Sequence, residues 1–184
     1  MDHIFRYLPF KELIKKSPVT AFLVLINIAI FAVGFFLEEF GFTESFTFLF
    51  GMANWFIDVK CEYYRFITAG FIHANLLHLG FNVMFGLYLI SAGVERLIGS
   101  FKFTIGYFLS LLGSSAVVYY FTESPFTLTV GASGDIYGML GILLYITLVK
   151  PNMISRHEAS SIKNLIFINV IFTFMASSIS VSGH

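Results

Sequence analysis

Residues 19–37 read VTAFLVLINIAIFAVGFFL, a run of 19 residues without one charged side chain. A helix needs about 20 consecutive apolar residues to cross the hydrocarbon core of a bilayer. Backbone N–H and C=O groups in lipid must be satisfied within their own segment, as they are in an α-helix. This stretch therefore predicts a membrane-spanning helix.

Four further apolar stretches predict four more helices: residues 66–93, 103–121, 126–149, which Asp135 interrupts, and 164–183. The Ser-rich end of the last one predicts a turn. No stretch shows the period-2 alternation of barrel strands, which are about 10 residues long. The predicted fold is therefore an all-α, polytopic transmembrane helical bundle with five full spans and the start of a truncated sixth.

The composition agrees with a membrane protein and excludes several other classes. The 184 residues are 57% hydrophobic and 12% charged, whereas a soluble domain carries about 25% charged residues. The formal net charge is zero, which gives no case for a nucleic-acid partner. The single cysteine, Cys61, excludes an internal disulfide and leaves no cysteine cluster for a metal.

The basic residues predict the orientation of the chain. If the N-terminus is inside, the inner segments hold nine lysines and arginines and the outer segments hold two, Lys60 and Arg65. We therefore expect residues 1–18 to be a cytoplasmic segment and residues 19–184 to be a multi-pass domain of the plasma membrane. The long, aromatic and acidic connection between the first two spans is expected to be ordered or functional.

Polar residues in the second span are costly in lipid and are expected to face the protein interior. His78 and Asn82 are four residues apart, so they share one face of a helix. Such a pair offers two donors at one point, as an oxyanion hole requires. A hydrogen-bond network between helices is the alternative. A metal site fits less well, because no carboxylate supports it. His73 lies about 140° from His78 on the wheel, so we expect it near the outer mouth.

The string GASG, residues 131–134, stands in the first part of the fourth span. Taken alone it is a weak signal, because its glycines continue at Gly138 and Gly141 and are typical of close helix packing. Ser133, however, lies near a helix start on the outer side, where free N–H groups stabilise an anion. A serine there needs a neighbouring base to become a nucleophile.

Two more polar residues belong to this outer side. His184 follows the fifth span and is the histidine placed to serve as a base, since His3 and His157 fall on the inner side. Asp135 is two residues beyond Ser133. An ionised carboxylate at that depth is costly, so Asp135 is protonated, faces a cavity or bonds a loop.

Together these residues resemble the rhomboid family of intramembrane serine proteases. The segments that carry the resemblance, in chain order, are Tyr64-Arg65, His73-x4-His78-x3-Asn82, Gly93-x-Glu95, Gly131-x-Ser133-Gly134, Tyr137 and Gly183-His184. Tyr64 stands where the family usually has a tryptophan. Each motif is modest, but their order and their membrane sides agree with the family from the first span to the last residue.

The resemblance implies a role for each of these positions. Ser133 would be the nucleophile and His184 the general base, with His78, Asn82 and the Ser133 N–H as the oxyanion hole. The supporting residues would be His73 and Arg65 as structural or access residues, Tyr137 as a stacking partner of His184, Glu95 as an inner anchor, and Gly131 and Gly134 beside the serine. The family implies transmembrane substrates cut near the outer face, and neither a cofactor nor a metal.

Two other functions remain as alternatives. One is an inactive relative that binds transmembrane helices without cutting them, although such a relative should lack the serine or the histidine. The other is a small proton-coupled transporter, which would explain the intramembrane histidines but not the GASG string. The family's sixth helix would continue beyond His184, so we expect the membrane domain to be C-terminally incomplete.

Overall fold

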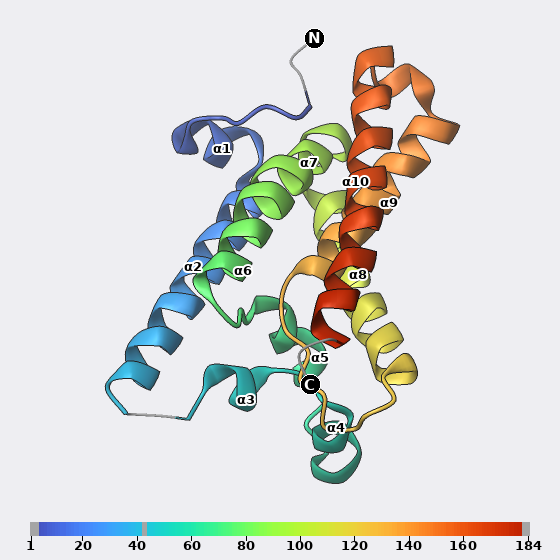
Figure 1. The fold of residues 1–184 in the computed structure, drawn as a ribbon. Helices are drawn as coiled ribbons and strands as arrows, with labels where there is room; N and C mark the ends of the chain where they lie inside the picture. Colours follow the sequence, from blue (N-terminus) through green and yellow to red (C-terminus); the bar gives the residue numbers. More distant parts are fainter. Residues whose placement is uncertain (1–3, 42–43, 182–184) are drawn as a thin grey trace. The chain divides into compact units, whose positions relative to one another are not determined.

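A computed structural model of the protein describes residues 4–41 and 44–181. The chain divides into two compact units, Asp2–Met139 and Leu140–His184. Figure 1 shows that the described residues are helices joined by irregular connections, as the sequence predicts. The all-α class is therefore confirmed for the described part of the chain.

Three helices are long and apolar enough to cross a membrane within the described residues. They are α2 (Pro18–Glu39), the continuous helix Leu76–Ile98 and α8 (Ser100–Phe121). Pro18 opens α2, where its missing N–H and fixed φ cost nothing. In the first unit, α2 packs on the helix Leu76–Ile98, and the two run side by side in Figure 1.

The predicted count of five spans is not confirmed. The fourth predicted stretch becomes α9 (Ser133–Val149), which has 17 residues, because residues 122–132 form an irregular connection instead of helix. The fifth becomes α10 (Arg156–Val181), which begins with a charged turn and does not end in the predicted Ser-rich turn before Val181. A 3-10 turn, η3 (Pro151–Met153), joins α9 to α10.

The second predicted span is divided in the structure. Residues 65–71 form the short helix α5 (Arg65–Thr68) and the 3-10 turn η1 (Ala69–Phe71), and the long helix begins only at Leu76. Asn75 stops the helix from starting earlier, because its side chain caps the first turn by accepting from the His78 N–H at 2.8 Å. His73 therefore precedes the helix that carries His78.

The long helix changes its hydrogen-bonding pattern along its length. It begins as α6 (Leu76–Phe81), continues as a π-helix, η2 (Asn82–Ser91), and ends as α7 (Ala92–Ile98). π-helical turns are rare and are frequent at functional sites. Here the π-helix begins at Asn82, one of the residues that the sequence selects.

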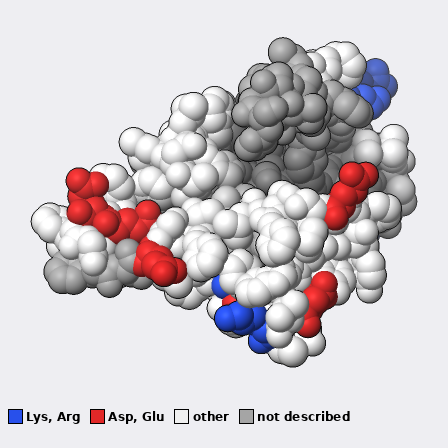
Figure 2. All heavy atoms as spheres, turned by 60° about the horizontal axis from the view of Figure 1, so that its bottom comes forward, with Lys and Arg blue, Asp and Glu red and all other residues white. Residues whose placement is uncertain are grey.

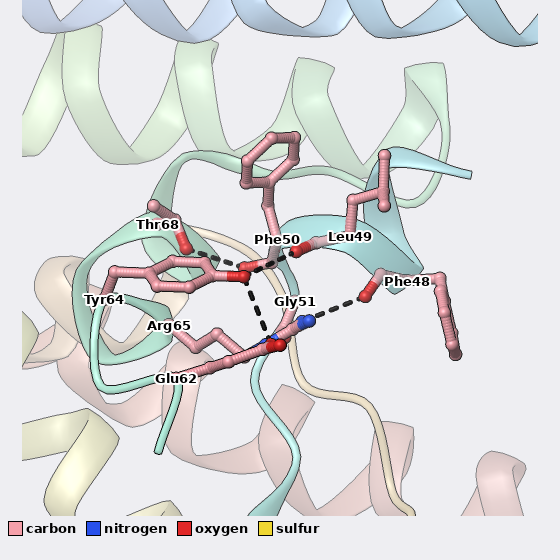
Figure 3. Close-up of polar contacts among 8 residues, drawn as sticks. All are labelled: Phe48, Leu49, Phe50, Gly51, Glu62, Tyr64, Arg65 and Thr68. Carbon is pink, nitrogen blue, oxygen red and sulfur yellow. Dashed lines mark hydrogen bonds and ion pairs between the residues drawn. The ribbon is translucent and has the colours of Figure 1, made fainter. Parts of the chain in front are cut away.

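The connection that the sequence predicts on the outer side, called the outer connection below, forms short helices within its described residues 44–65. It contains α3 (Phe46–Phe50) and α4 (Asn54–Lys60), and the buried Arg65, 3% exposed, holds α3 by its main chain. The Arg65 guanidinium donates to Phe48 O at 2.9 Å and Gly51 O at 2.5 Å, and pairs with Glu62 at 2.6 Å (Figure 3). Figure 2 shows a largely uncharged face that carries acidic side chains in separate patches and a small cluster of basic side chains.

At the opposite end of α2 a buried carboxylate joins three helices. Glu95 of α7 is 1% exposed and accepts from the N–H groups of Val19 at 3.1 Å and Thr20 at 2.8 Å. It also accepts from the Ser100 hydroxyl at 2.7 Å. A carboxylate at a helix N-terminus satisfies free N–H groups and the helix dipole, so Glu95 fixes α2 and α8 to α7.

In the second unit, the start of α10 is fixed by a capping box. The Ser155 N–H donates to the Glu158 carboxylate at 2.8 Å, and the Glu158 N–H donates back to the Ser155 hydroxyl at 3.2 Å. This reciprocal arrangement satisfies N–H groups that have no partner inside the helix.

Candidate active site

Ser133 is the first residue of α9, and the segment before it is held by main-chain hydrogen bonds. Met52 and Thr129 form an antiparallel bridge with N···O distances of 2.9 and 2.8 Å. The Gly131 N–H donates to Ala69 O at 2.9 Å. These bonds fix the chain up to the helix start, so Ser133 has a defined position in front of free backbone N–H groups.

His78 and Asn82 converge on Gly131, two residues before Ser133. A methyl group added at Gly131 would lie 2.6 Å from His78 Nε2 and 3.4 Å from Asn82 Nδ2. Gly131 also has a φ of 109°, which L side chains rarely adopt. Glycine is therefore required here both for the backbone and for the close approach of the two donors.

The Asn82 side chain is buried, with 6% of its surface exposed. Its Nδ2 makes no hydrogen bond to any part of the chain that the structure describes. A buried amide without a partner is costly, and such groups in native proteins call for an explanation. One explanation is that the Asn82 amide is kept free to donate to the oxygen of a ligand.

His73 lies beside His78, although it precedes the helix. The ring centroids are 5.1 Å apart with the planes at 69°, and His73 is buried. The wheel angle predicted from a continuous helix was wrong, because the chain between η1 and Asn75 is not helical. His73 is therefore a buried residue whose ring packs on that of His78, and its expected place near the outer mouth stays a prediction.

The glycine face of α9 packs on serines of α8. Methyl groups at Gly134 and Gly138 would overlap the side chains of Ser114 and Ser110, respectively, whereas one at Gly141 would meet nothing within 4 Å. Small residues facing each other let two helices approach closely. This contact fixes the first turns of α9, which carry Ser133.

Ser133 opens onto a small cavity of about 140 Å³. The cavity is lined by the residues beside the serine and by η1 and α8, among them Gly70, Leu111, Ser114, Gly131, Ser133 and Tyr137. Tyr137 stands one turn below Ser133, as the sequence predicts. Its predicted stacking partner, His184, lies outside the described residues.

Arg65 and Glu95 lie away from Ser133, at the positions described above, and each holds a connection in place. Asp135 is buried, 1% exposed, where its carboxyl faces Tyr107 of α8 and lies 3.5 Å from the position of a Gly70 Cβ. The sequence did not predict this contact between Asp135 and the neighbouring helix α8. Within the described residues, no group of three His, Cys, Asp or Glu side chains is arranged to hold a metal.

The residues of α8 that contact α9 beside the candidate site were not identified from the sequence. They are Tyr107, Ser110 and Ser114. A signal was present, because Gly106, Ser110 and Ser114 recur at intervals of four residues, the pattern of small residues in packed membrane helices.

Comparison with known proteins matches most of the chain to one family. The Rhomboid domain matches residues 60–184, which include every site residue named above. The chain is 36% identical over 123 residues to rhomboid protease GluP of Bacillus subtilis, covering 67% of this chain and 24% of that protein. It is 30% identical over 169 residues to rhomboid protease AarA of Providencia stuartii, covering 80% of this chain and 60% of that protein.

A third relative is the putative rhomboid protease YdcA of Bacillus subtilis, 32% identical over 124 residues. That match covers 67% of this chain and 61% of the relative, so the chain spans less than two thirds of each of these proteins. The domain match and the apolar helices together identify an integral membrane protein that belongs to the rhomboid family.

Proposed function

We propose that the chain is an intramembrane serine endopeptidase that cleaves transmembrane segments of other membrane proteins. The observation that carries the proposal is the convergence of His78 Nε2 and Asn82 Nδ2 on Gly131, two residues before a serine that begins a helix. The buried Asn82 amide donor has no hydrogen-bond partner in the described structure, which agrees with a donor kept for a ligand oxygen.

In the proposed reaction, Ser133 Oγ attacks the carbonyl carbon of the scissile peptide bond while His184 takes the hydroxyl proton. The carbonyl oxygen becomes an oxyanion, which the side chains of His78 and Asn82 and the Ser133 N–H stabilise. His184 then gives the proton to the departing amine as the C–N bond breaks. Water, deprotonated by His184, hydrolyses the acyl-enzyme. Each oxyanion donor contributes about 10²–10³ in rate, and the base about 10²–10⁴.

The remaining sequence-based expectations belong to this proposal. His73 supports the His78 ring, Tyr137 stacks on His184, Arg65 and Glu95 hold the outer and inner connections, and Gly131 and Gly134 permit the close contacts. The protein lies in the plasma membrane with residues 1–18 in the cytoplasm and residues 19–184 as the membrane domain. Its partners are transmembrane substrates and the bilayer, and the chemistry calls for no cofactor.

Labelling with a fluorophosphonate probe in detergent tests the proposal. We expect the protein to be labelled and the Ser133→Ala variant to be unlabelled, because the probe reacts with an activated serine. Ser124→Ala is the matched control, since Ser124 is an exposed serine of the connection leading to α9. The next measurement is cleavage of a transmembrane substrate, which we expect the protein to perform and the Ser133→Ala variant to lack.

Equal labelling of the protein and Ser133→Ala would refute the assignment of the nucleophile. If no variant is labelled while helix content is unchanged, proton flux in liposomes tests the transporter alternative.

A further inference from the structure

The N-terminal strap, residues 4–17, is tied along the inner half of the helix Leu76–Ile98. Arg96 donates to Ile4 O, and the Tyr88 hydroxyl donates to Leu8 O. Tyr7 donates to Met84 O at 3.3 Å and its ring stacks on that of Tyr88, with centroids 5.8 Å apart. The strap is therefore a fixed part of the fold, and Figure 1 shows it turning back beside the start of α2.

The helix of the strap, α1 (Phe10–Lys16), has one buried side. Leu13 is fully buried and packs with Ala21 of α2 and Ala92 of α7. This contact fixes which side of α1 faces away from the protein.

The outward side of α1 carries an apolar edge and a cationic edge. Phe10 and Ile14 are one turn apart and are 38% and 48% exposed. Lys11 and Lys15 are also one turn apart and exposed. Residues four apart share a helix face, so the two apolar side chains and the two ammonium groups form parallel rows.

The position of the strap places both rows at the membrane surface. A single residue, Ser17, separates α1 from α2, which is long and apolar enough to span a bilayer. Residues 4–17 hold Arg6, Lys11, Lys15 and Lys16 against Glu12, a net charge of +3. Glu12 lies 3.6 Å from Arg6 and 3.7 Å from Lys16, so its charge is directed away from the two outward lysines.

We propose that the N-terminal strap is a binding surface for anionic phospholipid headgroups. Lys11 and Lys15 contact the lipid phosphates, and Phe10 and Ile14 enter the boundary between headgroups and acyl chains. An amphipathic segment with basic residues beside apolar ones binds anionic lipid through both terms together. The strap's ties to Met84, Tyr88 and Arg96 join this lipid contact to the helix whose other end carries His78 and Asn82.

Native mass spectrometry of the full chain in detergent doped with phosphatidylglycerol measures this binding. We expect phosphatidylglycerol to be retained in preference to phosphatidylcholine. In the variant Lys11→Gln/Lys15→Gln, the apparent affinity for phosphatidylglycerol should fall about 10- to 30-fold, because each basic residue near an anionic surface contributes roughly a factor of five. Lys11→Arg/Lys15→Arg should bind as the parent does.

The control is Lys60→Gln, compared with the single change Lys11→Gln, because it removes the same charge from an exposed lysine that the sequence predicts on the other side of the membrane. It should retain the parent affinity, with circular dichroism confirming equal helix content in all variants. The proposal is wrong if Lys11→Gln/Lys15→Gln binds phosphatidylglycerol within twofold of the parent or if Lys60→Gln loses as much affinity as Lys11→Gln. Displacement of the lipid by soluble glycerol phosphate would also overturn it, because the site would then bind free anions.

Discussion

Gly131 combines a left-handed backbone with the close approach of two side chains. Its φ is 109°, and a methyl group there would lie 2.6 Å from His78 Nε2. We therefore expect Gly131→Ala to push the two donors away from the serine and to lower the fluorophosphonate labelling rate by about 10²-fold or more. The backbone strain should also cost roughly 1–2 kcal/mol of stability, measured by thermal unfolding.

Gly80→Ala is the control for that substitution. Gly80 lies in the same helix as His78, and a methyl group there meets nothing within 4 Å. Its labelling rate should equal that of the parent. A Gly131→Ala protein that is labelled at the parent rate would show that the geometry around Gly131 does not matter to the reaction.

Glu62 gives the outer connection a dependence on pH. The hydrogen bond from Arg65, the largest cause, lowers the pKa of Glu62 below its ordinary value of 4.5. A lowered pKa in the folded state means that the stabilisation is present above pH 4.5 and is lost as the pH falls through the folded-state pKa. We expect pepsin, which is active in acid, to cut residues 44–62 faster as the pH falls through the folded-state pKa of Glu62.

In Glu62→Gln this acid-dependent increase should be absent, because the side chain no longer titrates. The comparison uses folded protein at matched enzyme activity for each pH. An identical increase in the variant would assign the effect to another group.

At the scale of elements, the contact between α8 and α9 rests on serine facing glycine. A methyl group at Gly138 overlaps Ser110, so Gly138→Ala should destabilise the protein by about 1–3 kcal/mol through overpacking. Adding Ser110→Gly should recover much of that loss, because it removes the side chain that the new methyl group meets. Unfolding in detergent, followed by circular dichroism, measures both.

Gly141→Ala, on the same helix but with open space around it, should be neutral or slightly stabilising. If Ser110→Gly gives no recovery, the two residues are not in contact and the packing inferred for α8 and α9 is wrong.

The sequence predicts α2 and α8 to within about three residues, because long uncharged runs have few alternatives in a membrane. It places the start of the second span too early, because the apolar stretch runs through residues 66–75 but the Asn75 cap makes the helix begin at Leu76. It also extends the fourth span to residue 126, because hydropathy does not record that Gly131 adopts a positive φ.

The candidate site is predicted in the same uneven way. His78, Asn82 and Ser133 follow from motif spacing, and the structure brings the first two to Gly131. The serines of α8 do not follow, because their importance depends on a helix that comes later in the chain. The position of His73 beside His78 depends on loop geometry, which no helical wheel contains.

For the first unit as a whole, Glu95 is the residue on which three helices depend. Its buried carboxylate accepts from Val19, Thr20 and Ser100. Glu95→Gln replaces one acceptor oxygen with a donor and leaves at least one buried donor unpaired, so we expect a loss of about 1–3 kcal/mol. Glu123→Gln, an exposed change in the connection after α8, should have no effect. Equal melting temperatures for Glu95→Gln and the parent would contradict this role.

In the described structure, the hydrogen bonds that hold residues 48–52 are made to their main chain. Arg65 binds the carbonyls of Phe48 and Gly51, Thr68 binds that of Phe50 at 2.8 Å, and Met52 pairs with Thr129 through backbone atoms (Figure 3). A main-chain carbonyl is the same whichever side chain follows it. Evolution can therefore change the partly exposed side chains of residues 48–50, and with them the surface offered to passing molecules, while Arg65 and Thr68 preserve the path of the chain and Gly51 and Met52 stay fixed by packing.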